Sequence, residues 1–230
     1  MTRRLPTGLY ALTPDSVDDD WLVMAVQAAI RGGASAVQYR NKAVGPAQRL
    51  RQAQRLARVC REDGALFIVN DSIELAHAAQ ADGLHIGRED GDPATLRAAL
   101  GATPILGVSC YDSFERALAA RAIADYCAFG SVFVSSVKPG AVRAPLDLFA
   151  RARAAGLYAL AIGGIDADNA FEVAAAGAAA VAVITAVFGA EDGALRAAAP
   201  VIEASARRLA DAFAAGAQAA AARQPCRNAR

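Results

Sequence analysis

A run of five residues, Gln38-Tyr39-Arg40-Asn41-Lys42, follows a short apolar stretch and carries the clearest chemical signal in the sequence. Because side chains alternate along a strand, Gln38, Arg40 and Lys42 share one face, and Tyr39 and Asn41 share the other. An amide and two cations are costly to bury unless an anion meets them. The pattern predicts a site for a diphosphate attached to a polar ring. The spacing leaves one alternative open, in which Arg40 and Lys42 form ion pairs on a solvated loop.

Two aspartates follow neighbouring predicted strands, Asp71 directly after Asn70 and Asp90 shortly after residues 83–86. Two carboxylates beside cations and a diphosphate fit a Mg²⁺ site, because Mg²⁺ binds through one or two carboxylates plus phosphate oxygens. Alternatively, Asp71 caps the helix expected from Ile73 onward, and Asp90 is a turn residue. The pattern alone leaves both interpretations open.

Small and hydroxyl-bearing residues stand where the later strands are expected to end. Ser109 closes the fifth strand, and a long loop after the sixth carries hydroxyls and a single lysine, Lys138. Gly163 and Gly164 follow the seventh strand and would let backbone N–H groups approach a phosphate, with a helix N-terminus near Thr185 adding a favourable dipole. Loops after the last two strands of a barrel frequently hold phosphate. We therefore expect a phosphate site here; for the long loop, a flexible linker is the alternative.

The two histidines offer little for acid–base catalysis. We expect His77 to be exposed on a helix and His85 to be a hydrogen-bonded packing residue inside a strand. The sequence shows no Ser/His/Asp or Cys/His arrangement. A site rich in cations and poor in general bases favours a reaction driven by stabilising a departing diphosphate over one driven by proton abstraction.

Short apolar runs alternate with longer amphipathic segments along almost the whole chain. Buried parallel strands have this character, and eight of them are enough to close a barrel. We therefore predict a (β/α)8 TIM barrel, a single domain over residues 1–209, with its active site at the C-terminal ends of the strands. The rival, an open doubly wound sheet, lacks its Gly-x-Gly-x-x-Gly signature after the first strand. The predicted strands are residues 9–12, 36–39, 66–69, 83–86, 105–108, 126–129, 158–162 and 180–184.

The bulk composition limits the protein's partners and location. The 230 residues are 55% hydrophobic, which is enough for a sizeable core, and a net charge of +1 gives no general attraction to nucleic acid or membranes. The first apolar stretch is too short for a signal peptide or membrane span, so we expect a cytoplasmic protein. The cysteines have no metal or redox spacing and are expected to be free thiols. They are Cys60, Cys110, Cys127 and Cys226.

The last stretch, residues 210–230, is Ala-rich and then polar. We expect this C-terminal extension to fray into a disordered tail with no catalytic part. Alternatively, it forms a helix that packs on a partner subunit, so a homo-oligomer is left open.

These motifs, in this order, resemble the thiamine phosphate synthase family, and the resemblance spans roughly residues 9 to 192. It implies a transferase that joins a hydroxymethylpyrimidine diphosphate to a thiazole phosphate, or its carboxylated form, giving thiamine phosphate and pyrophosphate with Mg²⁺. It also implies a dissociative mechanism: pyrophosphate leaves first, the aminopyrimidine stabilises the resulting cation, and the thiazole nitrogen then attacks. The matching motifs are residues 38–42, 70–71, 81–87 with Asp90, 107–109, Lys138, 162–165 and 183–186.

The resemblance implies a role for each matched residue. Lys138, Arg40 and Ser109 are the implied catalytic residues, and Asp71 and Asp90 are the implied Mg²⁺ ligands. Toward the pyrimidine diphosphate the resemblance implies Gln38, Arg40, Lys42, Asn70, Ser109 and Lys138, and toward the thiazole phosphate it implies Ser135, Gly164, Ile184 and Thr185. Tyr39, Asn41, Ser136, Val137 and Gly163 complete the implied substrate-binding residues.

The long loop departs from the family pattern. The family usually has Thr-x-Thr-Lys where this sequence has Ser135-Ser136-Val137-Lys138. The side chain of Val137 cannot hydrogen-bond a phosphate, although its backbone N–H can. We expect the change to affect affinity for the thiazole phosphate more than the reaction.

Two other functions are alternatives to the synthase. A thiazole tautomerase on a similar barrel would have little need for the cations of residues 38–42 together with Asp71 and Asp90. A non-catalytic binder of thiamine precursors is disfavoured by the presence of Lys138 and both aspartates.

Overall fold

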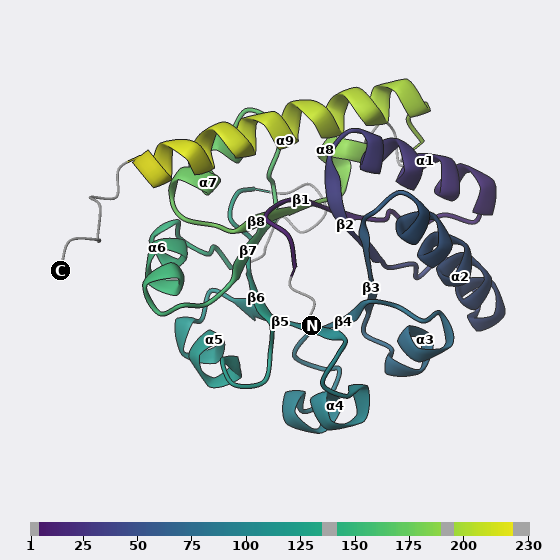
Figure 1. Ribbon diagram of the computed structural model, residues 1–230, viewed down its shortest axis with the longest axis horizontal. Coiled ribbons are helices and arrows are strands. Elements are labelled where there is room, and N and C mark those ends of the chain that lie inside the picture. Colours follow the sequence, from purple (N-terminus) through teal and green to yellow (C-terminus); the bar gives the residue numbers. More distant parts are fainter. Residues whose placement is uncertain (1–4, 135–141, 190–195, 223–230) are drawn as a thin grey trace.

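The computed structural model describes residues 5–134, 142–189 and 196–222. Eight parallel strands pair in sequence order, and β1 pairs with β8 to close a barrel that helices surround (Figure 1). This architecture confirms the predicted (β/α)8 TIM barrel. The strands are β1 (Gly8–Leu12), β2 (Ala34–Tyr39), β3 (Leu66–Asn70), β4 (Gly83–Ile86), β5 (Ile105–Tyr111), β6 (Tyr126–Phe129), β7 (Ala159–Ile162) and β8 (Ala180–Val183).

Four of the helices, α1, α3, α4 and α5, begin at a side-chain cap that the sequence supplies. Asp18 accepts hydrogen bonds from the N–H groups of Asp20 and Trp21 at the start of α1, and Asp92 and Ser113 cap α4 and α5 in the same way. The helices are α1 (Asp19–Arg31), α2 (Pro46–Glu62), α3 (Ile73–Ala78), α4 (Pro93–Leu100), α5 (Phe114–Ala120), α6 (Asp147–Ala154), α7 (Ala170–Ala175), α8 (Thr185–Phe188) and α9 (Ala199–Ala222).

The core has two layers because successive side chains of each strand point to opposite faces. The outer layer lies between strands and helices and is built mainly from Ala, Val, Leu and Phe side chains. The inner layer fills the barrel and combines small residues, such as Ala128 and Ala182, with the large rings of Tyr10 and Tyr126. The interior is therefore packed, and the open space that a substrate needs must lie at the mouth.

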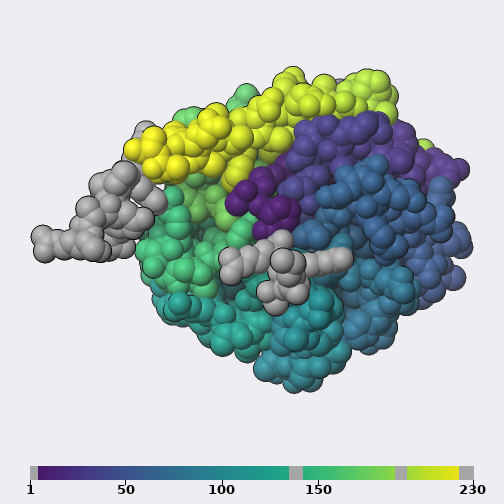
Figure 2. Space-filling model, in the orientation of Figure 1, coloured from purple at the N-terminus to yellow at the C-terminus, as the bar shows by residue number. Residues whose placement is uncertain are grey.

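The C-terminal helix corrects one expectation. The chain does not fray near residue 210, because α9 continues to Ala222 and lies along α1 and α7 (Figures 1 and 2). Phe213 and Ala220 are buried, and a Cβ on Gly216 would stand 2.2 Å from the backbone oxygen of Phe171. This apolar stripe gives the Ala-rich segment a packing surface on its own barrel. Residues 223–230 lie outside the described residues.

The helices and the cysteines bear on two further expectations. In the described ranges, no helix is long and apolar enough to cross a membrane. Cys60, Cys110 and Cys127 are buried free thiols, as predicted, whereas Cys226 lies outside the described residues.

Candidate active site

Strand β2 presents its two faces as the alternation predicts. Gln38 points into the barrel, where its Nε2 donates to the hydroxyl of Tyr10 at 3.1 Å. Tyr39 points outward to the helix layer, where its hydroxyl donates to Gln52 Oε1 at 2.7 Å. Arg40 follows at the barrel mouth, and its backbone is held by the Thr13 side chain through two hydrogen bonds of 3.0 Å. The inner face of β2 therefore leads directly to the mouth.

Asp15, on the loop after β1, is a mouth residue that the sequence analysis missed. Its Oδ1 lies 3.5 Å from Arg40 Nη1 and accepts from the backbone N–H of Lys42 at 2.8 Å. The expected alternative, a surface ion pair, thus exists for Arg40, whose side chain is 33% exposed. An exposed pair of this length contributes little to stability and leaves most guanidinium donors open to a ligand. No local signal links residues 25 positions apart, so only the fold reveals this contact.

Asp71 and Asp90 meet beside the two cations. Burial, followed by contact with the Asp90 carboxylate, raises the pKa of Asp71 to about 6, and Lys42 and Arg40 oppose that rise. Asp90 Oδ2 also accepts from the backbone N–H of Gly87 at 2.6 Å, so Asp90 shapes its turn as well. Two adjacent carboxylates that repel one another form a donor set suited to a hard cation. Among the described residues, no group of three or more potential ligands occurs, so a bound ion would draw its other oxygens from substrate or water.

Asp71 does not cap α3, which was the alternative for its presence. Ser72 is the N-cap, and its hydroxyl accepts from the N–H of Leu75 at 3.1 Å. Asp71 itself has a positive φ of 67°, an unusual conformation that Asp tolerates better than most residues. Neighbouring Asn70 ends β3 and is half-buried.

Ser109 lies beside His85, a contact that the sequence did not predict. His85 Nε2 lies 2.9 Å from Ser109 Oγ, and Nδ1 lies 2.9 Å from the hydroxyl of Tyr126. Burial lowers the pKa of His85 to about 4, so the ring is neutral at physiological pH. His85 is thus the hydrogen-bonded buried histidine that we expected, and His77 is exposed on α3 as expected.

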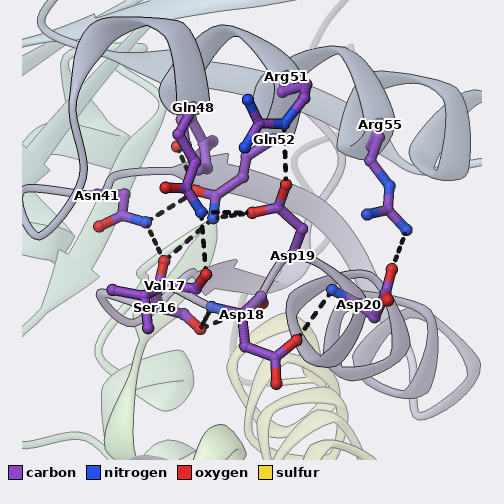
Figure 3. A network of polar contacts seen from close by, with 11 residues as sticks. Ser16, Val17, Asp18, Asp19, Asp20, Asn41, Gln48, Arg51, Gln52 and Arg55 are labelled. Carbon is purple, nitrogen blue, oxygen red and sulfur yellow. Dashed lines mark hydrogen bonds and ion pairs between the residues drawn. The ribbon is translucent and has the colours of Figure 1, made fainter.

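Asn41 belongs to a polar clamp around Gln52 on the outer side of β2 (Figure 3), and Tyr39 joins this clamp through its hydrogen bond to Gln52. Asn41 Nδ2 donates to the backbone oxygen of Ser16 at 2.6 Å and to Gln52 Oε1 at 2.8 Å. Gln52 Nε2 in turn donates to Asp19 Oδ1 at 2.8 Å. Both side chains are therefore engaged by protein partners on the outer side of β2. Their predicted role in substrate binding stays a prediction, and the geometry favours support of the loop that carries Arg40 and Lys42.

Gly163 and Gly164 let two loops approach closely at the opposite side of the mouth. Both have positive φ angles, 98° and 67°, and a Cβ would lie 2.2 Å from Ser131 Oγ or 2.4 Å from the backbone oxygen of Val134. The glycines are thus required by packing as well as suited to a phosphate. Ile184 and Thr185 stand at the start of α8, the short helix after β8 where barrel enzymes often bind phosphate.

The loop residues assigned to both substrates lie outside the described residues. They are Ser135, Ser136, Val137 and Lys138. Their predicted roles stay predictions.

A (β/α)8 barrel whose mouth combines a buried amide, two cations and two carboxylates is typical of enzymes that bind phosphorylated small molecules. The thiamine monophosphate synthase family model matches residues 9–187, and the chain belongs to this family. It is 55% identical to a thiamine-phosphate synthase of Chromobacterium violaceum over 80% of this chain and 90% of that protein. It is also 55% identical to one from Aromatoleum aromaticum, over 84% and 93%. A solved thiamine phosphate pyrophosphorylase from Pyrococcus furiosus superposes with a TM-score of 0.76 at 32% identity, over 91% and 96%.

Proposed function

We propose that this enzyme condenses 4-amino-2-methyl-5-(diphosphooxymethyl)pyrimidine with a thiazole phosphate to give thiamine phosphate and diphosphate. Family membership supports the transferase activity. The observation that carries the substrate assignment is the meeting of Asp71 and Asp90 beside Arg40 and Lys42, close enough for both cations to act on the Asp71 carboxyl. An anion and a divalent cation together would complete this arrangement.

The chain's own residues divide the work at the pyrimidine diphosphate. Arg40 and Lys42 would bind the diphosphate oxygens and stabilise the charge that grows there as the carbon–oxygen bond breaks. Gln38, Asn70 and Ser109 would hold the pyrimidine ring. Lys138 is proposed to bind the leaving diphosphate from the loop after β6.

Asp71 and Asp90 would hold Mg²⁺, which when bound supplies positive charge against the diphosphate. The two carboxylates suit this ion because they are adjacent and half-buried. No third potential ligand accompanies them in the described residues, so substrate or water would supply the other oxygens. Without a cation, burial and then the neighbouring Asp90 carboxylate raise the pKa of Asp71.

The thiazole phosphate is proposed to bind across β7 and β8. Backbone N–H groups of Gly163 and Gly164 and the start of α8 at Thr185 would bind its phosphate, with Ile184 beside the ring. Ser135, Ser136 and the backbone of Val137 would close over it.

The site supports a dissociative order of bond changes. The bond between the pyrimidine methylene carbon and the diphosphate oxygen breaks first, and both electrons leave with the diphosphate. The thiazole nitrogen then forms the new carbon–nitrogen bond with its lone pair. No side chain needs to abstract a proton, which agrees with the lowered pKa of His85, since that makes its imidazole a weak base. We place this reaction in the cytoplasm, since buried free thiols suit a reducing compartment.

A product assay tests the proposal. Purified enzyme would be mixed with both phosphorylated substrates and Mg²⁺, with and without a chelator, and thiamine phosphate followed by chromatography. We expect product that disappears with chelator and returns with excess Mg²⁺. Product that resists the chelator would contradict the metal assignment. No product despite binding of both substrates would contradict the synthase and favour a precursor-binding protein.

A further inference from the structure

Five polar side chains form one continuous hydrogen-bonded chain across the barrel interior. Successive contacts measure 3.1, 2.9, 2.9 and 2.9 Å, and every member except Ser109 is at most 8% exposed. These hydrogen bonds join Gln38 on β2 to Ser109 on β5, the two ends proposed to hold the pyrimidine. We call it the interior chain; its members in order are Gln38, Tyr10, Tyr126, His85 and Ser109.

The rings of the interior chain are held in place by packing. The Tyr126 ring stacks on His85 with centroids 5.5 Å apart and lies 6.1 Å from the Tyr10 ring. Gly107 makes room for it, because a Cβ there would stand 2.0 Å from the Tyr126 ring. The hydrogen bonds therefore join groups that cannot easily turn away from one another.

All three central groups are neutral at physiological pH. Burial raises the pKa of Tyr10 and of Tyr126 well above the ordinary tyrosine value. The His85 ring is 8% exposed, and its two nitrogens face the hydroxyls of Tyr126 and Ser109 and not a carboxylate, so it carries a single proton. Each tyrosine thus contributes one proton, and the imidazole contributes one.

Counting donors fixes the direction of the hydrogen bonds. Gln38 Nε2 can only donate, so the Tyr10 oxygen accepts and its own proton goes to Tyr126. Tyr126 then donates to His85 Nδ1, which leaves the proton on Nε2 and makes Ser109 Oγ an acceptor. In the reverse direction, Tyr10 would receive two donors, and its proton would have no acceptor among the residues that the structure describes. With Gln38 Nε2 facing Tyr10, as the structure places the amide, only the first direction uses every proton.

The two ends of the interior chain consequently have opposite character. Gln38 Oε1 has no side-chain or backbone donor in the described ranges. The lone pairs of Oε1 are thus not used by the residues that the structure describes. At the other end, the Ser109 hydroxyl accepts from His85 and keeps its own proton for another acceptor. The site thus presents an acceptor on β2 and a donor on β5.

We propose that Tyr10, Tyr126 and His85 are positioning residues that fix this polarity and thereby select an aminopyrimidine. The inference rests on the proposed function. An aminopyrimidine has an exocyclic amino group that donates and ring nitrogens that accept, which complements Gln38 Oε1 and the Ser109 hydroxyl. A 4-oxo pyrimidine has a carbonyl where the amino group stood and an N–H beside it, so acceptor would face acceptor and donor would face donor. A site built on hydrogen bonds rejects such an analogue because buried polar groups are left unpaired.

The test compares kcat/KM for the aminopyrimidine diphosphate and its 4-oxo counterpart. The intrinsic difference in reactivity cancels when each variant's ratio is divided by that of the wild type. We expect Tyr126→Phe to reduce the preference for the amino substrate at least about tenfold, mainly through KM. Tyr10→Phe should do the same and serves if the first variant folds poorly. Tyr158→Phe is the matched control, because it removes a phenol hydroxyl that donates to the backbone of Pro6, and its ratio should stay unchanged.

Equal loss on both substrates, or an unchanged ratio in both chain variants, would overturn the inference. A second measurement does not depend on turnover: ¹⁵N NMR of the substrate-free enzyme should show His85 protonated on Nε2 only. Protonation on Nδ1 would overturn the proposed direction. If no pyrimidine is turned over but the tautomer is as expected, the proposed function fails. Dissociation constants of the two pyrimidine diphosphates then decide the selectivity, and equal constants would overturn it.

Discussion

The two faces of β2 carry two different kinds of polar network. On the inner face, Gln38 begins the interior chain, whose two ends keep unused hydrogen-bonding atoms at the barrel mouth. On the outer face, Tyr39 and Asn41 enter the clamp around Gln52, where the polar groups bond to other protein groups. Neighbouring residues along β2 and its following loop thus have different roles. The inner ones remain available to a ligand, and the outer ones fix the loop that carries Arg40.

The largest effect on turnover should come from the inner face at the mouth. Arg40→Gln removes the guanidinium that pairs with Asp15 on this face. We expect kcat/KM to fall about 10²- to 10³-fold, the usual loss for one charge-stabilising group. Its thermal midpoint should change little, because the ion pair with Asp15 is part-exposed. Arg51→Gln on the outer side is the control and should keep kcat/KM. Steady-state kinetics and thermal unfolding measure both; similar losses in the two variants would remove the distinction between the faces.

Breaking the outer clamp should affect stability before catalysis. Gln52→Leu takes the acceptor away from the buried Tyr39 hydroxyl and removes one hydrogen bond each from Asn41 and Asp19. We expect the free energy of unfolding to fall by roughly 2–4 kcal/mol. Urea denaturation measures the change, while kcat at a temperature well below unfolding should stay within a few-fold. A large loss of kcat in fully folded protein would show that the clamp acts directly on the site.

A smaller effect should appear in the pH dependence of the metal-free protein. The pKa of Asp71 is raised to about 6 in the folded state, so its favourable contribution is present below the unfolded value near 4 and is lost as pH rises through 6. Asp71→Asn should remove that loss and stabilise the metal-free protein at pH 8 by on the order of 1 kcal/mol, after allowance for screening at a half-exposed group. Asn also tolerates the positive φ.

Denaturation at pH 4 and pH 8, with and without Mg²⁺, measures the Asp71 effect. Added Mg²⁺ should stabilise the wild type at pH 8 and should have much less effect on Asp71→Asn. A variant that is less stable than wild type at pH 8 without metal would contradict the repulsion between Asp71 and Asp90.

The smallest effect should come from the rim of the clamp. Arg55 pairs with Asp20, whose side chain is 89% exposed. Arg55→Ala should change the free energy of unfolding by no more than about 0.5 kcal/mol and leave kinetics unaltered. A loss comparable to that of Gln52→Leu would mean that the clamp extends to the surface.

The sequence by itself determined the barrel, the strand positions and the inward and outward sets of β2. Alternation along a strand and the length of apolar runs are local properties, so Gln38 and Tyr39 could be assigned to opposite faces without a structure. Caps such as Asp18 and Ser113 are local too. The expected fraying near residue 210 failed because composition does not reveal that Gly216 meets α7.

Only the tertiary structure decided which distant polar groups share a hydrogen bond. Tyr10 and Tyr126 are 116 residues apart and read as ordinary core residues, yet they link Gln38 to Ser109. Asp15 reaches Arg40 because neighbouring parallel strands end at one mouth, a contact that no local pattern indicates, whereas the meeting of Asp71 and Asp90 was expected from their places after neighbouring strands. Hydrogen bonds act over about 3 Å, whereas sequence patterns fix which face a side chain takes and not which partner it meets there.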